Sequence, residues 1–171
     1  MTRENERSPS VFSEVSDLTG VLATVVALTN TQTSQKAAAT KDVAGMSVVI
    51  PAGEFPIGAT YTFMLAGTKD ATNGTLAVKL NLNGTNVLTL TSAGNYSGDW
   101  FFKGSVSSTG AATQNCFGSY TQTGRVEVFD YAAGAKNTSG VNTLKATITN
   151  SSASDTVTVE YGRIEYVYIA S

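Results

Sequence analysis

Residues 75–91 alternate between apolar and polar side chains, and the alternation is interrupted at Asn83-Gly84. The even-numbered positions from Leu76 to Leu82 are apolar and fall on one face of an extended chain, because strand side chains alternate with period two. Asn-Gly is typical of a type I′ turn, in which both central residues need a positive φ. The segment therefore predicts a β-hairpin with one buried face.

The same alternation recurs through the rest of the chain after residue 46, where Gly, Pro and Asn repeatedly interrupt it. No stretch there has the period of a helix. Many short strands separated by turn residues are typical of sandwiches, jelly rolls and barrels. We therefore predict an all-β fold, an antiparallel, jelly-roll-like β-sandwich. Its expected strands are 46–50, 60–66, 75–82, 87–91, 98–106, 113–121, 124–131, 143–149 and 156–169.

The start of the chain departs from this pattern. Residues 1–17 are polar and charged, which predicts an extended N-terminal arm that gains order only against another chain. Residues 18–45 are expected to hold a first strand, over 18–29, and then a linker or one short helix. We interpret 18–29 as a strand and not as a signal peptide or membrane span, since its apolar run is far shorter than the about 20 residues of a span. Residues 46–171 are the expected β-sandwich domain.

Charged residues make up 14% of the sequence, and 11 Lys and Arg against 13 Asp and Glu give a net charge of −2. Thr, Ser and Asn must therefore supply most of the polar surface. A nucleic-acid-binding face needs a stripe of basic residues, so we expect neither nucleic acid nor a membrane as a partner. The single cysteine, Cys116, is expected to be a small buried strand residue, which fits assembly in a reducing compartment.

The sequence contains no histidine, which excludes Ser-His-Asp and Cys-His catalytic arrangements and the usual zinc sites. Residues 69–74 hold too few carboxylates for a calcium loop. A pair of carboxylates is the remaining way to catalyse a reaction, since glycoside hydrolysis needs two of them. The alternation of the strands directs most of the candidate carboxylates to solvent; the candidates are Asp99, Glu127, Asp130, Glu160 and Glu165. We therefore expect a protein that is not an enzyme, with no catalytic residue, no cofactor and no metal.

Trp100, the only tryptophan, admits two interpretations. It is either a core aromatic residue or an exposed platform on which a sugar ring stacks. Its neighbours Phe101 and Phe102 require that at least one of these rings faces each side of the strand. The sequence favours the core without excluding the platform.

In the last expected strand, apolar side chains occur on both faces after Gly162. A bulge at this glycine would reset the alternation, or the second face is covered by another subunit. On the second interpretation Tyr166, Tyr168 and Ile169 form a subunit interface. The tyrosines of the chain are candidates to line either a saccharide groove or such an interface, because tyrosine is enriched in both settings; they are Tyr120, Tyr131, Tyr161, Tyr166 and Tyr168.

Three segments resemble small β-domains of tailed-bacteriophage structural proteins. In residues 98–114 a strand bearing Trp100 runs into Thr-Gly-Ala-Ala-Thr-Gln at 109–114 and a returning strand. Ile-Pro-Ala-Gly at 50–53, followed by 58–61 and 65–68, is similar to the opening of these domains, and 142–147 to their closing run. The resemblance covers roughly residues 48–169. It implies a jelly-roll-like virion module, often trimeric, used on capsid surfaces, head fibres or tail tips, and it implies no catalytic residue.

The expected function is therefore that of a capsid decoration (cement) or head-fibre protein in the virion, assembled in the host cytoplasm. It would bind the major capsid protein or other virion proteins as a homotrimer, through arm residues Val11, Phe12, Val15 and Leu18. The alternative is a tail or fibre-tip domain that binds host surface glycans through Trp100 or the pair Tyr166 and Tyr168.

Overall fold

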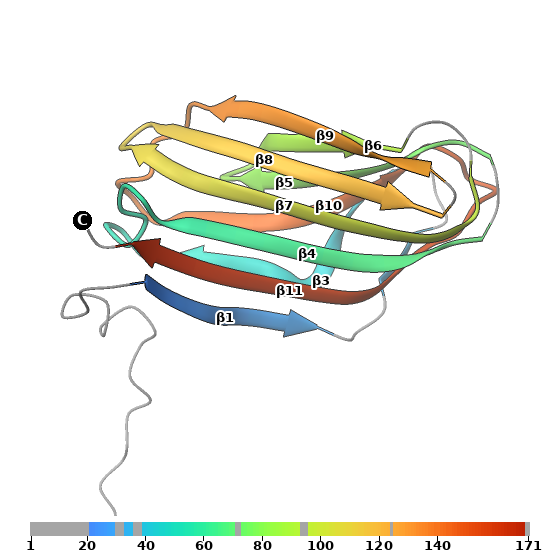
Figure 1. Ribbon diagram of the computed structural model, residues 1–171, viewed down its shortest axis with the longest axis horizontal. Helices are drawn as coiled ribbons and strands as arrows, with labels where there is room; N and C mark the ends of the chain where they lie inside the picture. The colour runs from blue at the N-terminus through green and yellow to red at the C-terminus, as the bar shows by residue number, and fades with distance from the viewer. Residues whose placement is uncertain are drawn as a thin grey trace, which may run out of the picture.

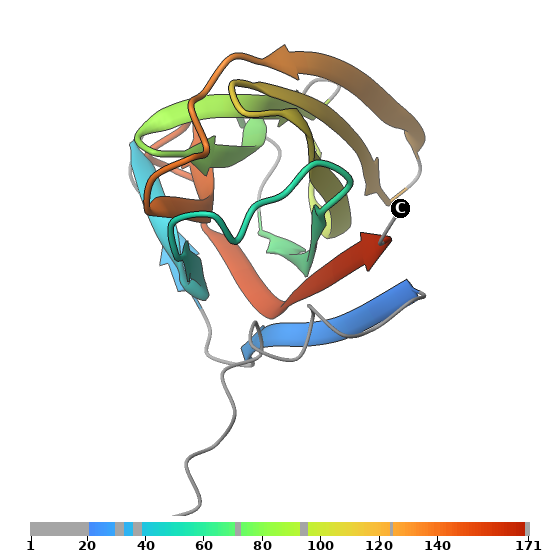
Figure 2. The same cartoon turned by 90° about the vertical axis from the view of Figure 1, so that its left-hand side faces the viewer.

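A computed structural model describes residues 21–29, 33–35, 39–70, 73–92, 96–123 and 125–169. These residues form two antiparallel β-sheets packed face to face, which Figure 1 shows from the front and Figure 2 from one end. The prediction of an antiparallel, jelly-roll-like β-sandwich is confirmed. The strands are β1 Val21–Thr29, β2 Thr33–Gln35, β3 Thr40–Ile50, β4 Thr60–Lys69, β5 Leu76–Leu82, β6 Thr85–Thr91, β7 Gly98–Gly110, β8 Thr113–Gln122, β9 Arg125–Gly134, β10 Asn142–Asn150 and β11 Val157–Ile169.

The two sheets differ in size. The large sheet has the strand order β1-β11-β4-β7-β8-β9, with the short β2 also paired to β11, and the small sheet has the order β3-β10-β5-β6. In Figure 1 the large sheet lies in front of the small one. The outer face of each sheet, turned away from the other sheet, therefore meets solvent.

The core lies between the sheets and follows the period-two pattern. On β4, Tyr61, Phe63 and Leu65 are buried and the residues between them point outward. Close approach of the sheets depends on Gly118 of β8, where an added Cβ would lie 2.7 Å from Leu88 and 2.8 Å from Leu90 of β6. A side chain at this position would therefore push the sheets apart.

The predicted hairpin forms as the sequence indicates. Asn83 and Gly84 have φ values of 51° and 82° and connect β5 to β6. The side chain of Asn83 accepts a hydrogen bond from the backbone of Thr143 (2.8 Å) and donates one to Asn142 (2.7 Å), which ties the turn to β10. The hairpin is thus built into the small sheet through its turn as well as its strands.

The expected linker or helix over 30–45 is wrong where the structure describes these residues. Residues 33–35 form β2, and β3 begins at Thr40, six residues before the expected start of the sandwich domain. The pairing of β3 with β10 shifts register between Lys145 and Thr147, opposite Gly45, whose φ is 72°. The sequence pattern therefore does not identify residues 40–45 as part of a strand, because the irregularity breaks the alternation by which strands are recognised.

The last strand, β11, contains a bulge, as the first of the two interpretations predicts. The bulge lies two residues before Gly162, the position expected from the sequence. The register of β11 against β4 shifts between Val159 and Tyr161, so the extra residue is Glu160 and not Gly162. After the shift Ile164 and Tyr166 face the core. The bulge at Glu160 therefore explains why the buried face of β11 changes after this residue, and a second subunit is not needed to explain it.

The arm and its expected anchors Val11, Phe12, Val15 and Leu18 lie outside the described residues. In the part of the chain that the structure describes, no helix is long and apolar enough to cross a membrane. Cys116 is fully buried, as predicted, and burial raises the pKa of its thiol to about 11.

Candidate functional site

The exposed aromatic side chains of the described residues lie on one surface, the outer face of the large sheet. They are Phe101 on β7, Phe117 on β8, Tyr131 on β9 and Tyr161 on β11, with exposed fractions of 41%, 51%, 61% and 39%. Phe101 and Phe117 point outward because their strand neighbours Trp100 and Cys116 point into the core. The strands of the small sheet contain no aromatic residue. The two solvent-facing surfaces of the sandwich therefore differ sharply in chemistry.

Phe117 and Tyr131 form a directly opposed pair across β8 and β9. The Tyr131 hydroxyl donates a hydrogen bond of 2.8 Å to the side-chain oxygen of Asn115, on the same face of β8. This bond holds the Tyr131 ring beside β8 before any ligand arrives. A platform held in this way loses less freedom on binding than a mobile side chain does.

Phe101 borders a shallow groove near the start of β7. The groove has a volume of about 240 Å³ and is lined by Asp99, Trp100, Phe101, Thr121, Gln122 and Thr123. The Thr123 hydroxyl accepts a hydrogen bond from the backbone N–H of Asp99 (3.1 Å), which joins the ends of β7 and β8. The groove thus combines one exposed ring with a carboxylate and two hydroxyl groups.

A cation lies on the same face between the groove and the platform. Lys103 is exposed on β7, opposite Met64 of β4 and Ser119 of β8, and makes no hydrogen bond or ion pair within the described part of the chain. Arg163 of β11 is the other cross-strand neighbour of Met64, and it forms an ion pair with Glu165. Lys103 is therefore the available positive charge nearest to the exposed rings Phe101 and Phe117.

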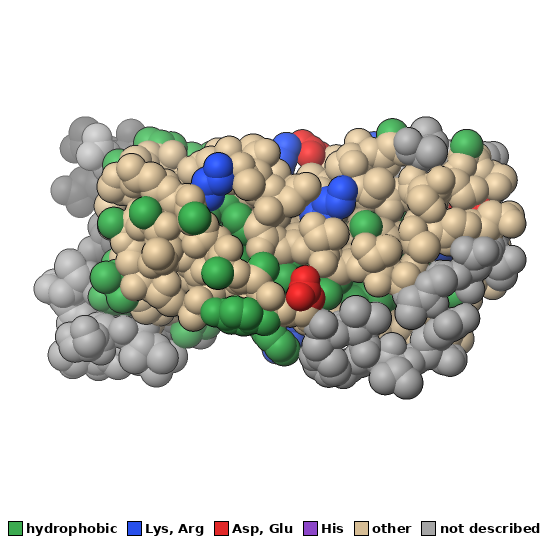
Figure 3. All heavy atoms as spheres, turned by 90° about the horizontal axis from the view of Figure 1, so that it is seen from above, with side chains coloured by type: hydrophobic (Ala, Val, Ile, Leu, Met, Phe, Trp, Pro, Cys, Tyr) green, Lys and Arg blue, Asp and Glu red, His purple; other side chains and the backbone are tan. Residues whose placement is uncertain are grey.

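Outside these groups the surface is polar and sparsely charged. Figure 3 views the molecule from above and shows Lys, Arg, Asp and Glu side chains standing apart, among many atoms that are neither charged nor hydrophobic. Such a surface produces little long-range field, and short-range contacts must decide what it binds.

The structure supports the core interpretation of Trp100. Its side chain is 2% exposed, and its ring stacks on Tyr120 with ring centroids 6.3 Å apart and an interplanar angle of 13°. The alternative, an exposed platform for a sugar ring, is wrong for this residue. Trp100 occupies an inward position of β7, and Phe101 takes the outward one.

The expected subunit contact at Tyr166 is also wrong in this structure. The side chain is 1% exposed, and its ring packs 4.9 Å from that of Tyr61 in the core. Tyr168 is half-buried against the same core, and Ile169 pairs through its backbone with Val21 of β1. The bulge at Glu160 sets this phase, so the tyrosines of β11 after it serve the interior.

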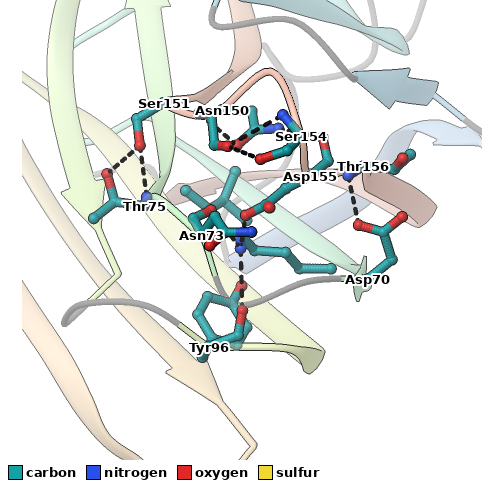
Figure 4. Close-up of polar contacts among 12 residues, drawn as sticks. Asp70, Asn73, Thr75, Tyr96, Asn150, Ser151, Ser154, Asp155 and Thr156 are labelled. Carbon is teal, nitrogen blue, oxygen red and sulfur yellow. Dashed lines mark hydrogen bonds and ion pairs between the residues drawn. The ribbon is translucent and has the colours of Figure 1, made fainter.

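A second polar cluster lies in the interior, at the end of the sandwich where β4 ends. Figure 4 shows Asn73, Tyr96 and Asp155 converging there from three loops. The buried ammonium of Lys69 donates to the backbone oxygens of Asn73 (3.2 Å) and Tyr96 (3.1 Å) and forms an ion pair with the buried carboxylate of Asp155. Asn150 donates to the Asp155 backbone oxygen (2.7 Å). The cluster ties the loops together and exposes no reactive group.

Of the carboxylates expected on solvated strand faces, Asp99, Asp130 and Glu160 are exposed, whereas Glu165 is half-buried and forms an ion pair with Arg163. Among the described side chains no group of three or more metal-ligating residues comes together. Sequence reasoning missed Phe117 as a site residue. The signal was present for Phe117, because a buried Cys116 requires that its neighbour in the strand faces outward.

No protein-family model and no curated protein sequence matches this chain. Solved structures are similar to it at low identity. The CBM2 module of the evolved Dit of Lactobacillus casei BL23 phage J-1 gives a TM-score of 0.43 at 12% identity, over 91% of this chain and 93% of that one.

Two further structures behave in the same way. Lectin I-B4 of Griffonia simplicifolia, in its metal-free form, gives a TM-score of 0.40 at 10% identity, over 92% of this chain and 97% of that one. The CBM36-1 domain of a multidomain xylanase from the hindgut metagenome of Trinervitermes trinervoides gives 0.37 at 13% identity, over 84% and 96%.

Proposed function

We propose that this chain is a non-catalytic binding module that recognises carbohydrate on the outer face of its large sheet. The observation that carries the proposal is the gathering of Phe101, Phe117, Tyr131 and Tyr161 on this face, against none on the opposite one. Exposed rings keep apolar surface in water, and proteins concentrate such surface where a ligand covers it. Sugar rings offer a matching ligand, because they carry apolar C–H faces bordered by hydroxyl groups.

The surroundings of the rings suit the hydroxyl groups of a sugar. Ser105, Ser119 and Thr121 lie beside Phe101 and Phe117 on the same face and carry hydroxyl groups. The Ser105 hydroxyl donates to the backbone oxygen of Phe117 (3.4 Å) and retains its capacity to accept. A rigid sheet holds these groups at fixed spacing, so little conformational entropy is lost on binding. A protein partner of the usual kind would call for a larger apolar centre than these separated rings provide.

The same face favours binding over catalysis. It is open, the groove beside Phe101 is shallow, and an open face does not exclude water from a reacting bond. Glu165 is paired with Arg163, and Asp99 lies six residues away along the strand direction, about 20 Å at about 3.3 Å per residue. That separation is far larger than that of the two carboxylates in a glycosidase. Asp99 and Glu160 lie nearer to each other, on either side of Thr68, whose hydroxyl donates a hydrogen bond to Glu160 (3.1 Å), but both carboxylates are exposed on this open face.

The test is a double substitution of the platform, Phe117→Ser with Tyr131→Ser, assayed on a glycan array and by titration calorimetry. We expect binding to weaken about tenfold or more, equivalent to about 1.4 kcal/mol, with the fold retained. The matched control is Val49→Ser with Val141→Ser, which removes equally exposed apolar side chains at the small sheet. Binding that survives the platform change, or falls equally in the control, contradicts the proposal.

A second candidate function is attachment to a virion as a capsid decoration or head-fibre protein. It is favoured by the resemblance of residues 98–114, which form β7, the following turn and the start of β8, to virion β-domains. On this proposal the chain is a homotrimer in the virion, assembled in the host cytoplasm, and residues 1–17 bind the major capsid protein or its neighbours. Deletion of residues 1–17 should abolish occupancy on purified particles while leaving a folded trimer. Unchanged occupancy, or a monomeric wild-type protein in sedimentation, contradicts it.

A further inference from the structure

Two ligand contacts lie on the outer face of the large sheet at a fixed spacing along β7 and β8. The first is Phe101 with its groove, opposite Thr121, and the second is Phe117, opposite Ser105 and beside Tyr131. Phe101 and Ser105 are four residues apart on β7, about 13 Å at about 3.3 Å per residue. A single sugar unit does not reach both contacts, whereas a chain of several units laid along the strands does.

Lys103 stands between these contacts on the same face. It is two residues from Phe101 along β7 and is the cross-strand neighbour of Ser119, which is itself two residues from Phe117. Its ammonium has no acidic partner among the described residues. A ligand that contacts both rings must therefore pass over an unpaired positive charge.

The carboxylates near this path are placed to leave the middle of it positive. Asp99 borders the groove at one end, four residues from Lys103, and Glu165 is held by Arg163 two strands away. Glu160 lies at the Asp99 end as well, because it accepts a hydrogen bond from Thr68 (3.1 Å), the cross-strand neighbour of Asp99. Asp99 accepts hydrogen bonds from neutral hydroxyl groups and repels an anion, so the groove suits a neutral sugar unit. The ammonium of Lys103 attracts an anion at the centre of the path.

We infer that the carbohydrate bound by this face is a linear acidic glycan, lying along β7 and β8 with a neutral unit at Phe101 and a carboxylate-bearing unit at Lys103. This inference rests on the proposed function. It adds the chemical class of the ligand, its direction on the sheet and a minimum length.

The test measures the affinity of the full chain for oligosaccharides of hyaluronan, unsulfated chondroitin and heparosan, in each of which carboxylate-bearing units alternate with neutral ones, in the native and the carboxyl-reduced form. We expect at least one native series to bind about tenfold or more tightly than its reduced form, with affinity rising until the oligosaccharide spans both contacts. The preference should shrink as salt is added, because the interaction is exposed and screened.

Lys103→Gln should bring the native and reduced forms to equal affinity. The matched control is Lys79→Gln on β5, a lysine on the outer face of the small sheet that also has no partner in the described structure. It should leave the preference unchanged. Equal affinity of native and reduced forms for the wild-type chain overturns the inference, as does an equal loss in the Lys79 variant.

The two proposals fail in different ways. Binding of neutral glycans that depends on Phe117 and Tyr131, without a preference for acidic ones, overturns this inference and leaves the proposed function standing. Absence of binding to every glycan, acidic or neutral, overturns both.

Discussion

The hydroxyl group of Tyr131 on β9 is hydrogen-bonded to the side-chain oxygen of Asn115 on β8, at 2.8 Å, on the solvent-facing side of the large sheet. The bond joins neighbouring strands outside the backbone ladder. It fixes the more exposed ring of the Phe117–Tyr131 pair in one orientation. The platform is therefore organised in the free protein.

Tyr131→Phe keeps the ring and removes this bond. We expect the affinity for a glycan to fall by about two- to fivefold, because an exposed hydrogen bond contributes about 0.5–1 kcal/mol to orientation. Tyr131→Ala should cost about tenfold or more, since it removes the stacking surface. Titration calorimetry distinguishes the two. If Tyr131→Phe is as harmful as Tyr131→Ala, the hydroxyl contacts the ligand directly instead of positioning the ring.

Lys69→Met should destabilise the fold strongly. The substitution leaves the carboxylate of Asp155 buried without its ammonium, which costs about 3–5 kcal/mol in the free energy of unfolding. Chemical denaturation measures this change. The matched control is Lys145→Met, whose ion pair with Asp42 (2.8 Å) is exposed and should contribute about 0–1 kcal/mol. Equal effects of the two substitutions would show that burial of the Lys69 pair has no energetic consequence.

Gly118→Ala should lower stability by about 1–3 kcal/mol, because the new Cβ meets Leu88 and Leu90 across the sandwich. Gly140→Ala is the control, since a Cβ there meets no atom within 4 Å. It should be neutral or stabilising by up to about 1 kcal/mol through the unfolded chain. Thermal unfolding of both variants tests the packing distance between the sheets. A neutral Gly118→Ala would contradict it.

Alkaline pH should weaken the fold. Burial raises the pKa of Tyr166 and of Tyr96 to about 12, and of Cys116 to about 11, and it also raises the pKa values of Tyr61 and Tyr120. These groups keep their protons in the folded state at a pH where the unfolded chain, with pKa values of 9.0 for Cys and 10.0 for Tyr, has lost them. The unfolded state then binds fewer protons, so stability falls as pH rises above about 9.

Denaturation midpoints measured between neutral pH and pH 11 check this expectation, together with tyrosinate absorbance. A midpoint that stays constant across this range would contradict the burial of the interior tyrosines and of Cys116.

The fold was predictable from the sequence wherever alternation runs unbroken. Residues 75–91 predicted β5, the turn and β6, since local alternation and an Asn-Gly pair act together there. Alternation failed at Gly45 and Glu160, where irregular pairing changes the phase of a strand without a compositional signal. Bulges depend on the neighbouring strand, which a single segment does not reveal.

The candidate site was predictable only in part. Phe101 and Phe117 follow from the inward placement of Trp100 and Cys116, but their approach on one face requires the register of β7 with β8. The Lys69–Asp155 pair joins residues 86 positions apart, and its only local sign is a lysine at an inward position of β4. Contacts of this kind depend on which strands and loops lie side by side in the fold, and the periodicity of residues along the chain does not show that.

The central claim is that carbohydrate binds to the outer face of the large sheet. Its most direct test is to map backbone amide chemical shifts by NMR, on titration with the glycan that binds most tightly in an array. We predict that the shifts concentrate on β7, β8 and β9, around Phe101, Lys103, Phe117 and Tyr131. Shifts confined to the small sheet, or no shift with any glycan, would contradict the account.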